Sequence, residues 1–119
     1  MTAIPIPRDT SPIDPLALVQ FLVRSQAHLV RMQAALAGHS PIVDARALQR
    51  IVQWSREIAV GAEVAGLPRL AHAADDVENL AVEALVSTTP DPIALGVRLG
   101  EKLRVLGARI EAEFLPDAD

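Results

Sequence analysis

Three histidines are the side chains of this 119-residue chain that are best suited to nucleophilic, acid–base or metal chemistry near neutral pH. His72 is the strongest candidate, because Asp75 and Asp76 follow it three and four positions later. On a helix, this spacing places carboxylates beside the imidazole, where they could orient it or form a weak metal site. The competing interpretation is that His72, Asp75 and Asp76 are solvated side chains on the outer face of a helix. We expect His28 at the edge of the core or at the surface, and His39 in a loop without a chemical role.

Motifs for other chemistries are missing from the sequence. There is no Ser-His-Asp spacing, no Gly-rich phosphate loop, no HExxH pair and no cysteine. The net charge of −4 argues against nucleic-acid binding, which requires a basic surface. The N-terminus does not resemble a signal peptide, and no apolar run approaches the ~20 residues of a membrane span. We therefore expect a cytoplasmic protein that is not an enzyme, needs no cofactor or metal, and binds neither nucleic acid nor membrane.

Proline positions and apolar periodicity divide the chain into an arm and four helices. Three prolines within residues 1–13 predict an extended or disordered N-terminal arm. Beyond the arm, apolar residues recur every three or four positions, which is typical of amphipathic helices. Half of the residues are hydrophobic, but only two are Phe and one is Trp, so the core must consist of Leu, Ile, Val and Ala. The sequence predicts an all-α fold, an antiparallel up-down four-helix bundle formed by residues 14–115.

Local signals place the ends of these helices. Asp14-Pro15 and Asp91-Pro92 each combine an N-cap residue with proline at the first helical position. We expect a first helix from about Pro15 to Ala37 and a second from Ser40 or Asp44 to a stop at Gly66. The third has Pro68 in its first turn and precedes a loop at residues 87–90, and the fourth starts at Asp91-Pro92, with Pro116 closing the fold. Glycine inside the last helix costs roughly 1 kcal/mol per residue, which a close approach of a neighbouring helix would offset. These glycines are Gly96, Gly100 and Gly107.

The segment from Ser55 to Leu70 carries a resemblance to a known family. It contains the end of one helix, a corner at Gly66, and the opening Leu67-Pro68-Arg69-Leu70 of the next helix. This arrangement resembles the signature of histidine phosphotransfer domains, in which an exposed mid-helix histidine precedes such a glycine by ten positions. Ile58 matches the hydrophobic position two residues after that histidine. Asp14-Pro15-Leu16 is similar to the usual opening of the first helix, and Val77-Glu78-Asn79-Leu80 to a helix of the phosphotransfer domain of chemotaxis kinases.

The residues that would carry phosphotransfer are replaced. Arg56 stands at the histidine position, Ala59 at the position of the family's lysine, and Val60 at the position of its first glycine. A guanidinium stays protonated and cannot attack phosphorus, alanine cannot offset phosphate charge, and valine fills the space left for a partner. Moving the alignment to use Gly61 would place Glu57 at the histidine position, which does not restore the chemistry. The resemblance therefore implies a member that has lost its phosphate acceptor.

What remains is a surface on the second helix. Its residues share one face by spacings of three and four, and the resemblance implies that a receiver domain docks there. We expect a non-catalytic interaction module of two-component signalling whose partner is a receiver domain or a histidine kinase. Arg56 could pair with the partner's carboxylates, or it could be a solvated charge paired with a carboxylate of its own chain. The predicted partner-binding residues are Val52, Arg56, Ala59, Val60 and Glu63.

Two alternatives remain open. The chain could be an active phosphotransfer protein that uses a displaced histidine, with His72 as the candidate. It could also be a helical interaction module unrelated to signalling, for example one that completes its core by forming a homodimer. Trp54 lies off the centre of the apolar stripe of its helix and could either close the side of the bundle or anchor an interface.

Overall fold

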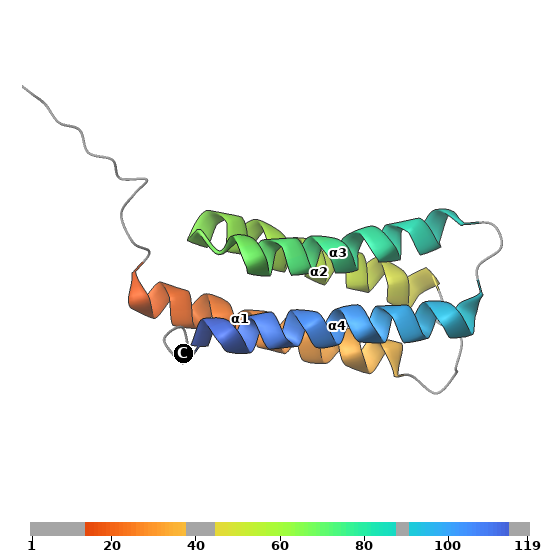
Figure 1. Ribbon diagram of the computed structural model, residues 1–119, viewed down its shortest axis with the longest axis horizontal. Helices are drawn as coiled ribbons and strands as arrows, with labels where there is room; N and C mark the ends of the chain where they lie inside the picture. Colours follow the sequence, from red (N-terminus) through yellow and green to blue (C-terminus); the bar gives the residue numbers. More distant parts are fainter. Residues whose placement is uncertain (1–13, 38–44, 88–90, 115–119) are drawn as a thin grey trace, which may run out of the picture.

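The computed structural model describes residues 14–37, 45–87 and 91–114, and within these it contains four α-helices and no strand. Each helix packs against its neighbour in the chain, and the first also packs against the last. In Figure 1 each helix runs back alongside the one before it. The predicted all-α four-helix bundle is confirmed. The predicted arm over 1–13, the loop at 38–41 and the two candidate starts of the second helix, Ser40 and Asp44, lie outside the described residues. The helices are α1 (Pro15–Leu36), α2 (Ala45–Ala65), α3 (Pro68–Val86) and α4 (Pro92–Phe114).

Two aspartates cap helix starts as the sequence predicts. The Asp14 carboxylate accepts a hydrogen bond from the backbone N–H of Leu16 at 3.3 Å. The Asp91 carboxylate accepts from the N–H groups of Ile93 at 3.1 Å and Ala94 at 3.2 Å. Each carboxylate satisfies backbone donors of a first helical turn that have no partner within the helix.

The corner between α2 and α3 is built on Gly66. Its φ of 76° lies in the left-handed region that only glycine adopts at little cost. This conformation lets the N–H of Leu67 donate to the carbonyl oxygen of Ala62 at 2.8 Å, which closes a Schellman motif. Because only Gly66 and Leu67 separate the two helices, α3 must fold back directly along α2.

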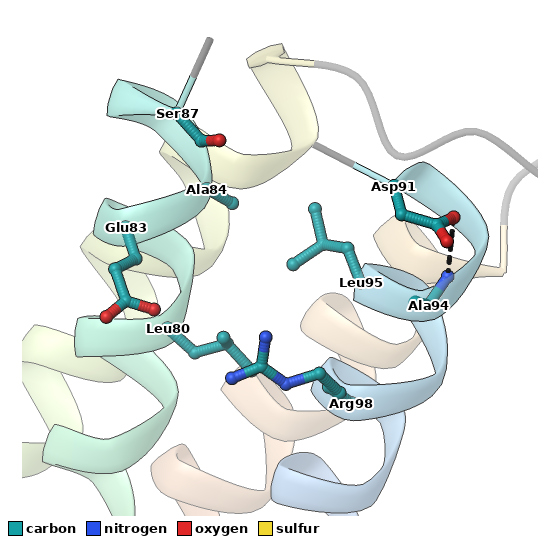
Figure 2. A pocket seen from close by; sticks show the side chains of 8 residues that line it. All are labelled: Leu80, Glu83, Ala84, Ser87, Asp91, Ala94, Leu95 and Arg98. Carbon is teal, nitrogen blue, oxygen red and sulfur yellow. Dashed lines mark hydrogen bonds between the residues drawn. The ribbon is translucent and has the colours of Figure 1, made fainter. Parts of the chain in front are cut away.

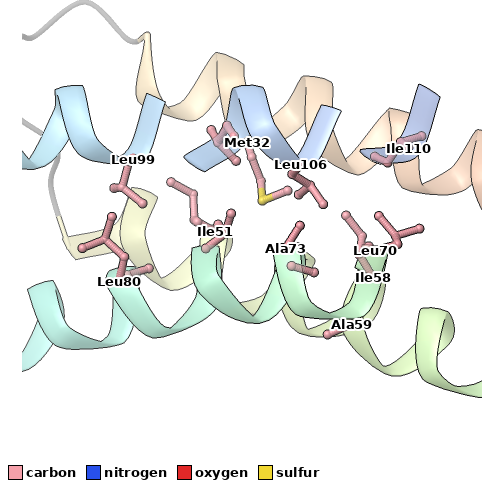
Figure 3. Packing of buried hydrophobic residues seen from close by; sticks show 14 of the residues in the cluster. Met32, Ile51, Ile58, Ala59, Leu70, Ala73, Leu80, Leu99, Leu106 and Ile110 are labelled. Carbon is pink, nitrogen blue, oxygen red and sulfur yellow. The ribbon is translucent and has the colours of Figure 1, made fainter. Parts of the chain in front are cut away.

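Side chains from all four helices meet in one apolar core (Figure 3). The pair α2–α3 has the most extensive contact. Helix α3 contributes several small buried residues to the core, among them Ala74 and Ala81. Trp54 is half-buried against this core, in agreement with a role in closing the side of the bundle. The largest fully buried apolar side chains are Leu22, Met32, Ile51, Ile58, Leu70, Val77, Leu99, Leu103, Leu106 and Ile110.

The close approach expected at the glycines of α4 is found at Gly107. A Cβ there would lie 3.0 Å from Cδ2 of Leu29 on α1, which is tighter than an ordinary contact. At Gly100 the corresponding distance, to Cδ2 of Leu36, is 3.8 Å, an ordinary contact. A closer approach that the sequence analysis did not single out occurs at Gly61, where an added Cβ would collide with the ring of Phe21.

Candidate functional site

Three of the five residues predicted to bind a partner lie at the solvent face of α2. Arg56 lies near the middle of the helix with its side chain 62% exposed. Val60 is 56% exposed, and Glu63 is exposed one turn further on. Val64, which the sequence analysis did not include, is 81% exposed beside them. We call these four residues, Arg56, Val60, Glu63 and Val64, the α2 surface.

The other two predicted residues do not belong to this surface. Ala59 is only 4% exposed and forms part of the core (Figure 3). Val52 is half-buried and packs against the same core. The expectation of a shared exposed face fails for Ala59 and is met only in part by Val52. The reason is that α2 packs against α1 and, more extensively, against α3. Two neighbours bury a wider arc of the helix than the single apolar stripe that periodicity reveals.

Arg56 is engaged within the molecule. Its Nε donates to Oε2 of Glu78 on α3 at 2.8 Å, and a terminal nitrogen lies 2.7 Å from the same oxygen. The Glu78 side chain is only 16% exposed, so the pair lies at the edge of the α2–α3 interface. Of the two possibilities left open for Arg56, pairing with a carboxylate of its own chain is the one observed. A partner carboxylate would have to share this guanidinium with Glu78.

His28 occupies a site that the sequence analysis missed. It is 9% exposed, and its Nε2 lies 3.1 Å from a carboxylate oxygen of Glu57 on α2, while its Nδ1 lies 3.2 Å from a guanidinium nitrogen of Arg31. Because a guanidinium can only donate, Nδ1 accepts and Nε2–H donates to Glu57, which defines a neutral imidazole. Burial lowers the pKa of His28 below its ordinary value, and the neighbouring Arg31 and Arg24 lower it further, against the opposing effect of Glu57.

Sequence reasoning could not find this contact, because its partners are 29 positions apart on different helices. The His28 site contains a small cavity of about 130 Å³ between α1 and α2. The hydroxyl of Ser25, a lining residue, is buried and has no hydrogen-bond partner. A cavity of this size can admit water, which would satisfy such a group. We therefore regard His28 and Glu57 as a polar link between two helices.

His72 lies in a groove between α3 and α4. Its side chain is 80% exposed, and Nε2 lies 3.8 Å from a carboxylate oxygen of Asp76. The groove has a volume of about 340 Å³, and its lining includes Arg69 and Arg109. Arg69 precedes His72 by three positions in the chain, whereas the fold brings Arg109 to the groove from 37 positions away. Asp75 does not line this groove.

A second groove, of about 300 Å³, lies where α3 ends and α4 begins (Figure 2). Glu83 of α3, Arg98 of α4 and Asp91, which precedes α4, give it mixed charge. The Asp91 carboxylate already caps α4, as the bond to Ala94 in Figure 2 shows. Asp91 therefore serves the helix end, and we assign the groove no chemistry.

Comparison of the chain with protein-family models, with curated proteins and with solved structures finds no match. Among the described residues, no three His, Asp or Glu side chains gather so that they could hold a metal ion. No helix in the described part of the chain combines the length and apolar character that a membrane span requires.

Proposed function

We propose that this protein is a non-catalytic interaction module of the phosphotransfer-bundle type. It docks a receiver domain or a histidine kinase domain of two-component signalling through the α2 surface. The four-helix bundle supports the proposal because the resemblance in sequence implies this architecture. The position of Arg56 supports it as well, since a phospho-accepting histidine would stand mid-helix and exposed, as Arg56 does.

The observation that carries the proposal is the pair of exposed valines beside Arg56. Val60 and Val64 are one helical turn apart, and both expose more than half of their side chains. Arg56 and Glu63 flank them with opposite charges. An apolar centre with a charged rim is the usual composition of a protein-binding patch.

The chemistry of Arg56 makes the module non-catalytic at this position. A guanidinium has no lone pair available to accept a phosphoryl group, but it pairs strongly with carboxylates. Receiver domains would offer carboxylates to it through their acidic pocket, in competition with Glu78. The module would then occupy a phosphotransfer docking surface without exchanging phosphate.

The test is an NMR titration of the ¹⁵N-labelled protein with receiver and kinase domains from the same organism. We expect chemical-shift changes concentrated on α2, and Kd raised by more than about tenfold in the V60S/V64S variant, which loses apolar contact area. Val97→Ser is the matched control, because Val97 is 65% exposed on α4. If the domains bind without perturbing α2, or bind V60S/V64S as well as the original protein, the proposal is wrong.

A second candidate function, phosphotransfer through His72, is favoured by the groove between α3 and α4. The imidazole of His72 is accessible, and Arg69 and Arg109 could offset the charge of a phosphoryl group. In this reaction a ring nitrogen would attack phosphorus, and the phosphoryl donor's bond to phosphorus would break. Incubation with a phosphorylated kinase should then give an acid-labile phosphate that His72→Gln abolishes and His28→Gln retains. Failure to label, or equal labelling of His72→Gln, would exclude this candidate.

A further inference from the structure

Helix α1 carries apolar side chains on two opposite sides. One side faces the core through residues such as Leu22 and Met32. On the other side, Leu16 is 63% exposed, Val23 53% and Val30 61%. Amphipathic surface helices normally present polar residues on their outer face, so this apolar side is unexplained by the bundle itself.

The outer side chains of α1 form a continuous stripe. Leu16, Val23 and Val30 are spaced by seven residues, and small alanines follow Val23 and Val30 four positions later. At 100° per residue, all members lie within an arc of about 80°. This heptad spacing is the pattern by which one helix packs along another. We call this set, Leu16, Val19, Val23, Ala27, Val30 and Ala34, the α1 outer stripe.

The other exposed apolar residues of the bundle lack this continuity. On α4, Ile93 and Val97 are exposed, but Glu101 and Arg104 follow them on the same side before Val105. A charged side chain within the seam would be desolvated by a packed helix, which is costly. The α1 outer stripe therefore offers the longest uninterrupted apolar strip in the part of the chain described.

The charged side chains of α1 itself are all of one sign. Helix α1 contains no Asp or Glu, although the whole chain has a net charge of −4. Arg24 and Arg31, also seven residues apart, lie exposed along one edge, and Gln26 and Gln33 lie along the other. Charged residues at such flanking positions select a partner helix of opposite charge.

We propose that the α1 outer stripe binds an acidic amphipathic helix of another protein, with an apolar residue every three or four positions and carboxylates flanking them. A second copy of this chain is the weaker fit. Two antiparallel α1 helices would bring arginine against arginine, and two parallel ones would give Arg24 and Arg31 no carboxylate. The α1 outer stripe lies on a different helix from the α2 surface, so the proposal for its occupant does not depend on the two-component partner.

The test uses two synthetic helical peptides of the length of α1, 22 residues, with the same leucine heptads and either Glu or Lys at the flanking positions. We expect the Glu peptide to bind the full chain at least about tenfold more tightly than the Lys peptide. R24E/R31E should reverse this preference, and V23S/V30S should weaken binding of the Glu peptide by more than about tenfold. Val97→Ser on α4 should leave binding unchanged, and circular dichroism would verify that every variant is folded.

Three results would overturn the assignment. The first is equal binding of the two peptides, or a preference that R24E/R31E leaves unaltered. The second is a dimer in solution that V23S/V30S converts to a monomer, which would make a second copy the occupant. The third is binding of the Glu peptide only after removal of residues 1–13, which would mean that the chain's own N-terminal segment covers the stripe.

Discussion

His28 is held neutral by its surroundings, and this has a consequence for stability. Burial lowers its pKa in the folded protein below the unfolded value of 6.5, and protonation of Nδ1 would displace the Arg31 donor and place a cation beside Arg24 and Arg31. The unfolded chain then binds more protons than the folded chain as the pH falls. The stability that neutral His28 contributes to the fold is therefore fully present above pH 6.5, and it is lost as the pH falls through 6.5 towards the pKa of His28 in the folded protein.

We predict that the free energy of unfolding decreases between pH 7.5 and 5 and that His28→Gln reduces this decrease. Glutamine can donate to Glu57 and accept from Arg31 without titrating, so it removes the proton linkage while retaining the polar link. Urea unfolding at a series of pH values, compared between the two proteins, measures the difference. Parallel pH profiles would show that His28 does not contribute.

The ion pair of Arg56 and Glu78 should add little to stability. Because the Arg56 side chain is 62% exposed, water and salt screen the attraction. We predict a coupling energy of about 1 kcal/mol or less in a double-mutant cycle of Arg56→Ala and Glu78→Ala, measured by urea unfolding at low salt. A coupling energy well above this value would mean that the ion pair holds α2 and α3 together, which would leave Arg56 unavailable to a partner.

At the scale of the helices, two glycines should respond oppositely to the same substitution. Gly61→Ala would force the Phe21 ring away from α2, and such overpacking costs about 1–3 kcal/mol. Gly100→Ala places its Cβ at ordinary contact distance from Leu36, so the gain in helix propensity should prevail, up to about 1 kcal/mol. Thermal and urea unfolding of the two variants would give changes of opposite sign. A Gly61→Ala variant as stable as the original protein would contradict the close packing at Gly61, and a destabilised Gly100→Ala variant would contradict the ordinary contact at Gly100.

The helices themselves were largely predictable from sequence because their signals are local. Proline after aspartate, glycine at a corner, and apolar residues at helical spacing act within a few positions, so Asp14, Gly66 and Asp91 perform the predicted roles. The faces were predictable only in part. Periodicity shows that α2 has an apolar stripe but not that α3 packs closely enough to bury Ala59.

Contacts between helices escaped sequence analysis for the same reason. Glu57 meets His28, and Arg109 lines the groove of His72, because the bundle brings distant positions together. The outer stripe of α1 is visible in the sequence as a second set of apolar positions. It can be interpreted as a surface only once the other apolar set of α1 is known to fill the core.

At the scale of the whole molecule, packing does not stabilise the four helices equally. The α2–α3 contact is the most extensive, and a two-residue corner joins these helices, whereas α1 and α4 each share smaller contacts with their neighbours. Helix α1 also leaves an apolar side in water, so its packing recovers only part of the burial that its composition allows. Regions with fewer buried contacts open at lower free energy than the rest of a domain.

We therefore predict that backbone amides in the middle of α2 and α3 exchange hydrogen at least about tenfold more slowly than those of α1, because α1 can open while the α2–α3 pair stays folded. Native-state hydrogen exchange followed by NMR measures this directly. Equal protection in all four helices would instead mean that the bundle opens only as one unit. Addition of the Glu peptide should raise protection selectively in α1, since a ligand stabilises the part of the fold whose integrity its binding requires. If the peptide raised protection uniformly, or not at all, α1 would have no special role in binding it, even where the helices differ in stability.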